Sequence, residues 1–90
     1  LFFTASGLLA QSTADGMQHL YYQRYHSAAA TFQEMTASEP KDDQAWYGLA
    51  KAYLQQGETD KAKLALQAAP DKVYDEPWYQ AAKGEMLLNS

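Results

Sequence analysis

Apolar residues recur at intervals of three and four along most of the chain, the spacing that places them on one face of an α-helix. The clearest stripe is formed by Trp46, Leu49, Ala50 and Tyr53. Sixteen Ala and nine Gln also favour helix over sheet, because these unbranched side chains lose little rotamer freedom on a helix. We therefore predict an all-α fold.

Capping residues, glycine and proline predict where the helices begin and end. Ser12 and Asp15 form a capping-box-like pair at a helix start, and Gly57 accepts the left-handed conformation of a helix end. Pro70 stops one helix, and Pro77 lies near the first turn of the next, where its missing N–H costs nothing. Five helices are expected: about 13–22, 25–37, one from Asp42 or Asp43 to Gln56-Gly57, 59–69, and one capped by Asp75 or Glu76.

The chain repeats itself in two slightly different alignments. In the first, which we call the Trp46–Trp78 register, the residues Asp43, Trp46, Tyr47, Ala50 and Lys51 recur as Asp75, Trp78, Tyr79, Ala82 and Lys83. The second, the Phe32–Leu66 register, has a shift that is longer by two. Its pairs are Gly16 with Ala50, His19 with Tyr53, Ala28 with Ala62, Phe32 with Leu66 and Met35 with Ala69.

Self-similarity with a period of roughly 32 to 34 is typical of a helix-turn-helix solenoid, in which each unit buries its apolar face on its neighbour. We expect units at about 12–42, 43–74 and 75–90. The indoles of Trp46 and Trp78 are expected to occupy equivalent core positions in successive units.

These residues resemble the tetratricopeptide repeat family. Its pattern is met by Trp46-x2-Leu49-Ala50-x2-Tyr53 and by Ala62-x3-Leu66, and the preceding unit keeps Gly16, Ala28-x3-Phe32 and Pro40. His19 and Glu85 stand where the family usually has Tyr. The resemblance covers roughly residues 12–90. It implies a right-handed solenoid of about two and a half repeats, in which the first helix of each unit lines a concave groove.

A second stripe, offset by one residue from the Trp stripe, is expected to face this groove. The predicted peptide-binding residues are Met17, Tyr21, Tyr47, Lys51, Leu54, Tyr79, Lys83 and Met86. Thr13, Leu20, Gln55 and Leu87 extend the same stripe. Tyr and Met offer adaptable apolar contact and Lys attracts carboxylate, so the predicted partner is a protein or peptide that can carry an acidic group.

Several of these residues also have a purely structural interpretation. Lys51 and Lys83 can simply solvate the helices, and Tyr47 and Tyr79 can pack. Met86 and Leu87 can be covered by a further helix. The family's chaperone-docking members hold a peptide carboxylate with lysine, asparagine and arginine, but the first and third predicted helices contain no Asn. We therefore do not predict a chaperone clamp.

Composition excludes several other classes of function. The chain has 90 residues, no Cys, and a net charge of −4 with seven Lys plus Arg, which argues against a thiolate metal site and a nucleic-acid interface. No apolar run approaches the ~20 residues that span a bilayer. The spacing of His19 and His26 does not match a helical zinc pair, and no phosphate loop or nucleophile motif is present. We predict no enzyme activity, metal or cofactor.

The first residues differ from the rest of the chain. Residues 1–10 carry no charge and have the length of the apolar core of a secretory signal peptide, and Ala10-Gln11-Ser12 offers small residues for cleavage. We interpret residues 1–11 as the remnant of such a signal, which places the protein in the periplasm or at the outer membrane of a bacterium. The alternative is an ordered apolar helix on the first hairpin, in which case the protein is cytoplasmic.

Two main hypotheses of function follow. The first is a protein–protein interaction module that binds a peptide or partner subunit in the groove. The second is a structural solenoid segment whose groove is filled by its own chain or by a neighbouring subunit. A glycan-uptake scaffold rests on fold analogy alone. The apolar end Met86-Leu87-Leu88 also suggests self-association through the last helix.

Overall fold

The computed structural model describes residues 12–89, and this part of the chain contains helices and no strands. The predicted signal remnant, residues 1–11, lies outside the described residues and stays a prediction. The helices are α2 (Thr13–Tyr21), α3 (Tyr25–Ser38), α4 (Asp43–Gln55), α5 (Thr59–Ala68), the short 3-10 helix η1 (Asp71–Val73) and α6 (Pro77–Asn89). The prediction of an all-α fold is confirmed, and the helix ends agree within a few residues.

Local capping explains where the helices begin. At the start of α2, the Asp15 backbone N–H donates to the Ser12 hydroxyl over 3.1 Å, and the Ser12 N–H donates to the Asp15 carboxylate over 2.9 Å. The Asp42 carboxylate accepts from the Ala45 N–H at the start of α4. In the turn after α4, Gly57 has a φ of +77°, a left-handed backbone conformation that favours glycine. None of the helices in residues 12–89 has the length and apolar character needed to cross a bilayer.

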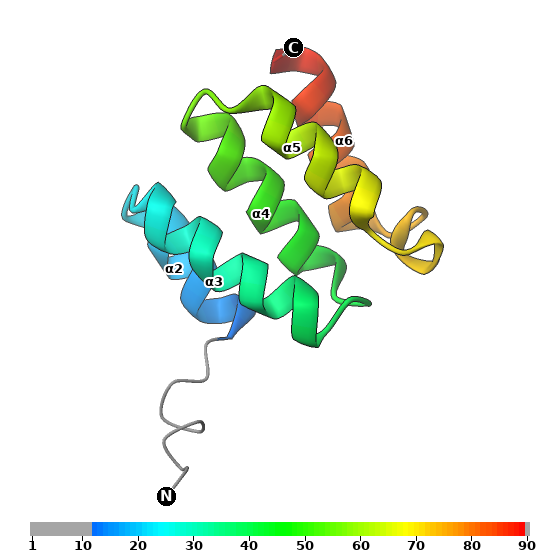
Figure 1. Cartoon of the computed structure of the whole chain (residues 1–90), viewed down its shortest axis with the longest axis horizontal. Coiled ribbons are helices and arrows are strands. Elements are labelled where there is room, and N and C mark those ends of the chain that lie inside the picture. Colours follow the sequence, from blue (N-terminus) through cyan, green and yellow to red (C-terminus); the bar gives the residue numbers. More distant parts are fainter. Residues whose placement is uncertain (1–11, 90) are drawn as a thin grey trace, which may run out of the picture.

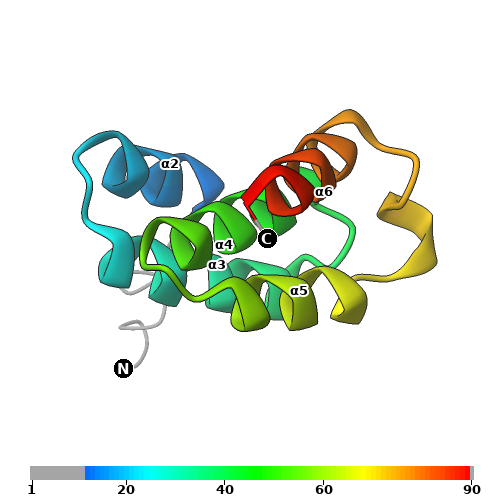
Figure 2. The ribbon, with the colours of Figure 1, turned by 90° about the horizontal axis from the view of Figure 1, so that it is seen from above.

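The helices are arranged in two layers. Figure 1 shows each helix folding back beside the one before it, so that α2 pairs with α3 and α4 pairs with α5. In Figure 2, α2 and α6 lie on either side of α4, with α3 and α5 on the other side of the molecule. Helix α4 therefore contacts all four other α-helices and forms the centre of the fold.

Phe32 is the side chain that joins the first three helices. It is fully buried at 0% exposure and extends from α3 to α2 and α4. A Cβ atom added at Gly16 or Gly48 would lie only 2.5 Å or 2.2 Å from the Phe32 Cζ atom. Glycine at these two positions therefore lets the ring lie directly against both helix backbones. Leu66, its counterpart in the Phe32–Leu66 register, is also buried.

The predicted equivalence of Trp46 and Trp78 is wrong. Trp46 is 7% exposed, and its indole N–H donates to the Pro40 carbonyl over 2.8 Å. Trp78 is 39% exposed and belongs to no part of the buried core.

The reason for this difference is the way α6 is turned on α4. The buried or core-packed residues of α6 are Tyr79, Ala82 and Met86, which correspond in the Phe32–Leu66 register to Ala45, Gly48 and Ala52 of α4. The Phe32–Leu66 register therefore describes the packing, whereas the Trp46–Trp78 register does not. In the register that describes the packing, Gln80 corresponds to Trp46, and Trp78 is turned away from the core.

Candidate partner-binding surfaces

The first candidate surface lies on the side formed by α2, α4 and α6, which we call the α2–α4–α6 face. At its centre, the rings of Tyr47 on α4 and Trp78 on α6 have centroids 4.8 Å apart. The Trp78 backbone N–H donates to the Asp43 carboxylate over 3.1 Å, which fixes the start of α6 beside the start of α4. This link holds the partly exposed indole next to Tyr47.

An ion pair continues this aromatic contact along the two helices. The Lys51 ammonium donates to Glu85 over 2.7 Å, so that α4 and α6 are joined by opposite charges. This hydrogen bond is the main reason that the pKa of Lys51 is raised. Burial, followed by a hydrogen bond to Glu85, raises the pKa of Tyr47. Lys51 therefore already has a carboxylate partner within the fold.

Apolar side chains on α2 and α4 extend the face. Met17 and Leu54 are partly buried and pack against the core. The Thr13 hydroxyl donates to the Asp42 carboxylate and joins the starts of α2 and α4. Tyr21 lies at the end of α2, is 80% exposed, and contacts the ring of Tyr22 edge-on at 5.1 Å. Aromatic and aliphatic groups are thus present on all three helices.

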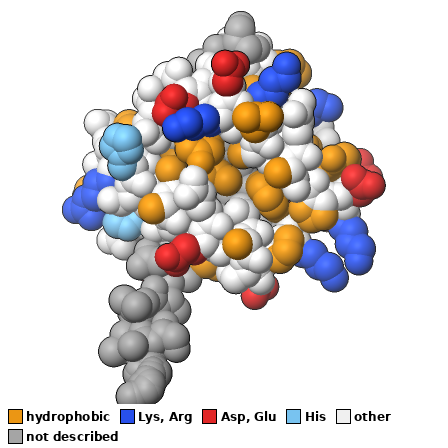
Figure 3. Space-filling model, in the orientation of Figure 1, with side chains coloured by type: hydrophobic (Ala, Val, Ile, Leu, Met, Phe, Trp, Pro, Cys, Tyr) orange, Lys and Arg blue, Asp and Glu red, His pale blue; other side chains and the backbone are white. Residues whose placement is uncertain are grey.

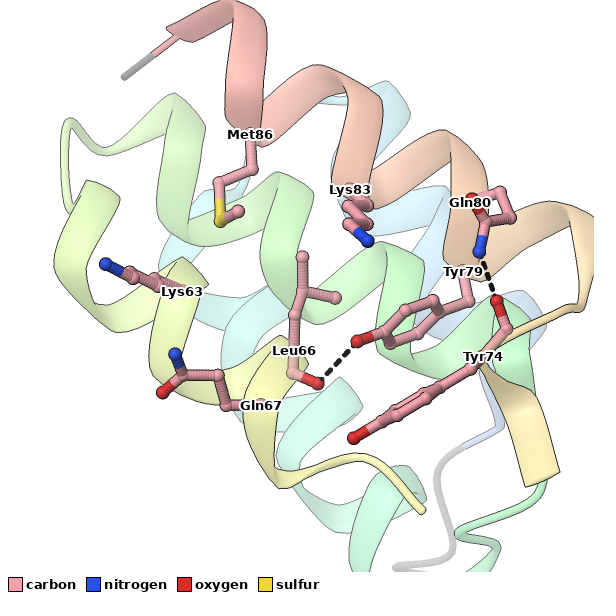
Figure 4. Close-up of a pocket in the computed structure, with 8 residues that line it drawn as sticks. All are labelled: Lys63, Leu66, Gln67, Tyr74, Tyr79, Gln80, Lys83 and Met86. Carbon is pink, nitrogen blue, oxygen red and sulfur yellow. Dashed lines mark hydrogen bonds between the residues drawn. The ribbon is translucent and has the colours of Figure 1, made fainter. Parts of the chain in front are cut away.

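The second candidate surface is a cavity of about 300 Å³ between α5 and α6, shown in Figure 4. The Tyr79 hydroxyl donates to the Leu66 carbonyl over 2.8 Å, and its ring stacks on Tyr74 at 5.1 Å. Burial raises the pKa of Tyr79, and the neighbouring Tyr74 adds to this effect. The cavity is lined by Lys63, Leu66, Gln67, Tyr74, Tyr79, Gln80, Lys83 and Met86.

The third candidate surface lies between α3 and α5, on the side of the molecule that Figure 3 shows. Apolar side chains gather there around a hollow of about 410 Å³. Trp46, Leu49 and Tyr53 of α4 line it together with Leu64 and Ala65 of α5. Because Trp46 and Leu49 belong to the buried core, this hollow exposes the edge of that core.

A family model described as Tetratricopeptide repeat matches residues 19–86. The chain belongs to the tetratricopeptide repeat family. No curated protein and no solved structure gives a significant match. Tetratricopeptide repeats are in general protein–protein interaction modules and are typically not enzymes, so the family supports this general class of function. Within residues 12–89, no group of three or more His, Asp or Glu side chains is placed to hold a metal ion.

The predicted binding residues of this tetratricopeptide repeat chain lie on two different surfaces. Met17 and Tyr21 belong to α2, and Tyr47, Lys51 and Leu54 belong to α4, two of the three helices that form the α2–α4–α6 face. The other three predicted residues, Tyr79, Lys83 and Met86, line the α5–α6 cavity instead. The prediction that they share one groove with Tyr47 follows the Trp46–Trp78 register, which differs by two positions from the packing of α6. Their role in binding stays a prediction.

Sequence reasoning missed Trp78 on the α2–α4–α6 face and Lys63, Gln67 and Tyr74 in the cavity. The analogy with Trp46 assigns Trp78 to the core. The signal that could have found its true location is the Phe32–Leu66 register, which places Gln44 and Trp78 in equivalent positions. The three cavity residues lie on α5 and in the connection to α6, where no motif marks them.

The Lys51–Glu85 pair leads to a prediction about alkaline pH. In the folded protein, the pKa values of Lys51 and Tyr47 lie above their ordinary values of 10.5 and 10.0. Both groups therefore hold their protons more tightly in the folded protein than in the unfolded chain. The contribution of these two groups to the free energy of unfolding is therefore fully present below about pH 10. It is lost as the pH rises through their raised pKa values. Glu85→Gln should lower the free energy of unfolding by up to about 1 kcal/mol at neutral pH, since the pair is partly exposed.

Urea unfolding of both proteins at about pH 7 and about pH 11 tests this prediction. The difference between wild type and Glu85→Gln should shrink at the higher pH. Glu34→Gln, which removes an exposed carboxylate on α3, serves as the matched control and should change stability little at either pH. A Glu85→Gln difference that is unchanged or larger at high pH would contradict the assignment.

Proposed function

We propose that this chain is a protein-interaction module that holds a peptide segment of a partner on the α2–α4–α6 face. The observation that carries the proposal is the contact between Tyr47 and the 39% exposed Trp78, with ring centroids 4.8 Å apart on neighbouring helices. Tyr and Trp are enriched at the energetic centres of protein interfaces, because each combines a large apolar area with a polar tip.

The charges on this face suggest how the partner is recognised. Lys51 and Glu85 contribute one charge of each sign, and they satisfy each other over 2.7 Å. An acidic peptide would have to compete with Glu85 for Lys51. We therefore expect apolar contact with Trp78 and Tyr47 to provide most of the affinity, with Leu54 further along α4 adding to it and the ion pair contributing at the polar rim.

Peptide selection followed by direct titration tests the proposal. Short random peptides displayed on phage are selected on the wild-type protein, and the enriched peptides are labelled and titrated by fluorescence anisotropy. Trp78→Ala should weaken binding by about tenfold or more, which corresponds to about 1.4 kcal/mol. Leu88→Ala, which removes a side chain that is 86% exposed on α6, ten residues after Trp78 and outside both cavities, is the matched control and should leave the affinity unchanged.

Two outcomes would contradict this function. One is equal affinity of wild type and Trp78→Ala for every selected peptide. The other is failure to select any peptide, together with a Trp78 indole that acrylamide cannot quench in the full-length protein. The second outcome would support the structural role, in which the face is already covered by the protein's own chain or by a neighbouring subunit.

A further inference from the structure

Helix α6 has an exposed stripe at the place where the preceding repeat has a covering helix. In that repeat, Leu64 and Ala65 of α5 lie beside Trp46, Leu49 and Tyr53 of α4. In the Phe32–Leu66 register, the residues of α6 that correspond to those three are Gln80, Lys83 and Leu87, and all three are exposed. Their spacing of three and four places them on one face of α6. A further helix could therefore pack on this face of α6 in the way that α5 packs on α4.

The α5–α6 cavity lies beside this stripe and gives the position an apolar floor. Leu66, Tyr79 and Met86 contribute to its lining, and its volume of about 300 Å³ is at the lower end for small ligand sites. Figure 4 shows the Met86 sulfur and the Lys83 ammonium among the groups that line the cavity. The cavity is therefore suited to one or two apolar side chains that project from a covering helix.

The charge around this cavity is opposite to that of the whole chain. Lys63 on α5 and Lys83 on α6 both line it, and none of its described lining residues is Asp or Glu. The chain as a whole has a net charge of −4. Two cations on neighbouring helices, without a carboxylate between them, favour an acidic occupant.

We infer that the Gln80–Lys83–Leu87 stripe and the adjoining α5–α6 cavity bind an amphipathic acidic helix of a partner protein. The helix places an apolar side chain in the cavity and carboxylates opposite Lys63 and Lys83. The polar character of Gln80 and Lys83 fits a transient partner, because the corresponding Trp46–Leu49–Tyr53 stripe, which packs beside α5 within the fold, is largely apolar. This surface is separate from the α2–α4–α6 face, so the inference does not depend on the proposed function.

A designed peptide probes this surface directly. It has about 16 residues, long enough to form a helix, with leucines along one face and glutamates beside them. A matched peptide has lysine in place of every glutamate. Binding of labelled peptides to the full chain is followed by anisotropy. The glutamate peptide should bind at least about tenfold more tightly than the lysine peptide, and its affinity should fall as salt is added.

Variants of the chain identify the charges involved. Lys63→Glu/Lys83→Glu should weaken binding of the glutamate peptide by at least about tenfold. Lys41→Glu/Lys72→Glu makes the same change in net charge with two exposed lysines outside the cavity and should have a much smaller effect. Far-UV circular dichroism verifies that both variants are folded. Equal losses in the two variants would overturn the inference, because they would show only an unspecific charge effect.

The methionine methyl groups report where the peptide lies. Met86 lines the α5–α6 cavity, whereas Met17 lies on α2 and is not part of that lining. In spectra of methyl-labelled protein, the peptide should shift the Met86 signal and leave that of Met17 in place. No binding, a shift of Met17 alone, or filling of the site by a second copy of the chain would overturn the inference. The tests of Trp78 in the proposed function stay valid in each case.

Discussion

Phe32→Ala is expected to lower the free energy of unfolding by about 3–5 kcal/mol, the largest loss for any single substitution proposed for this protein. The ring has 0% exposure and lies against the backbones of α2 and α4 at Gly16 and Gly48. Because these two positions have no side chains, neither of them can fill the space that the ring leaves. The substitution thus removes apolar contact and also leaves a cavity among three helices.

Urea unfolding followed by far-UV circular dichroism measures this loss. The expected value is a large part of the total stability of a domain of this size, so the measurement is best made with a stabilising osmolyte present. Tyr21→Ala is the matched control, since this aromatic side chain is 80% exposed, and it should change stability by less than about 0.5 kcal/mol. A loss below about 1 kcal/mol for Phe32→Ala would contradict the central role of the ring.

Gly48→Ala and Gly84→Ala are expected to change stability in opposite directions. Alanine is favoured over glycine inside a helix by about 1 kcal/mol. At Gly84 on α6, an added Cβ meets nothing within 4 Å, so this gain should be realised. At Gly48 the Cβ would lie 2.2 Å from the buried Phe32 ring, and overpacking should lower the free energy of unfolding by about 1–3 kcal/mol.

The same unfolding experiment gives both values, and a double variant tests the cause. In Gly48→Ala/Phe32→Leu, the smaller side chain leaves room for the new methyl group. The combined loss should therefore be smaller than the sum of the two single losses. Additive losses, or a stabilising Gly48→Ala, would show that the helix crossing can relax and that the short distance to Phe32 does not limit the packing.

The sequence by itself determined the helices and most of their ends. Helical spacing of apolar residues, the Ser12–Asp15 cap and the turn glycine Gly57 act over only a few residues, and local geometry alone fixes their effect. The longer of the two repeat shifts also identified pairs that the core uses, such as Phe32 with Leu66. The fold class and the family therefore follow from the sequence alone.

Only the tertiary structure decided how α6 is turned on α4 and α5. The sequence around Trp78 matches the Trp46–Trp78 register, whereas α6 packs in the Phe32–Leu66 register, and neighbouring residues on a helix point about 100° apart. A difference of two positions between the registers therefore turns the helix by about half a turn. Residues that one register places toward the core are placed toward solvent by the other. The hydroxyl of Tyr79 on the Leu66 carbonyl and the pairing of Lys51 with Glu85 fix this choice. Both contacts join residues distant in sequence, and local periodicity cannot specify them.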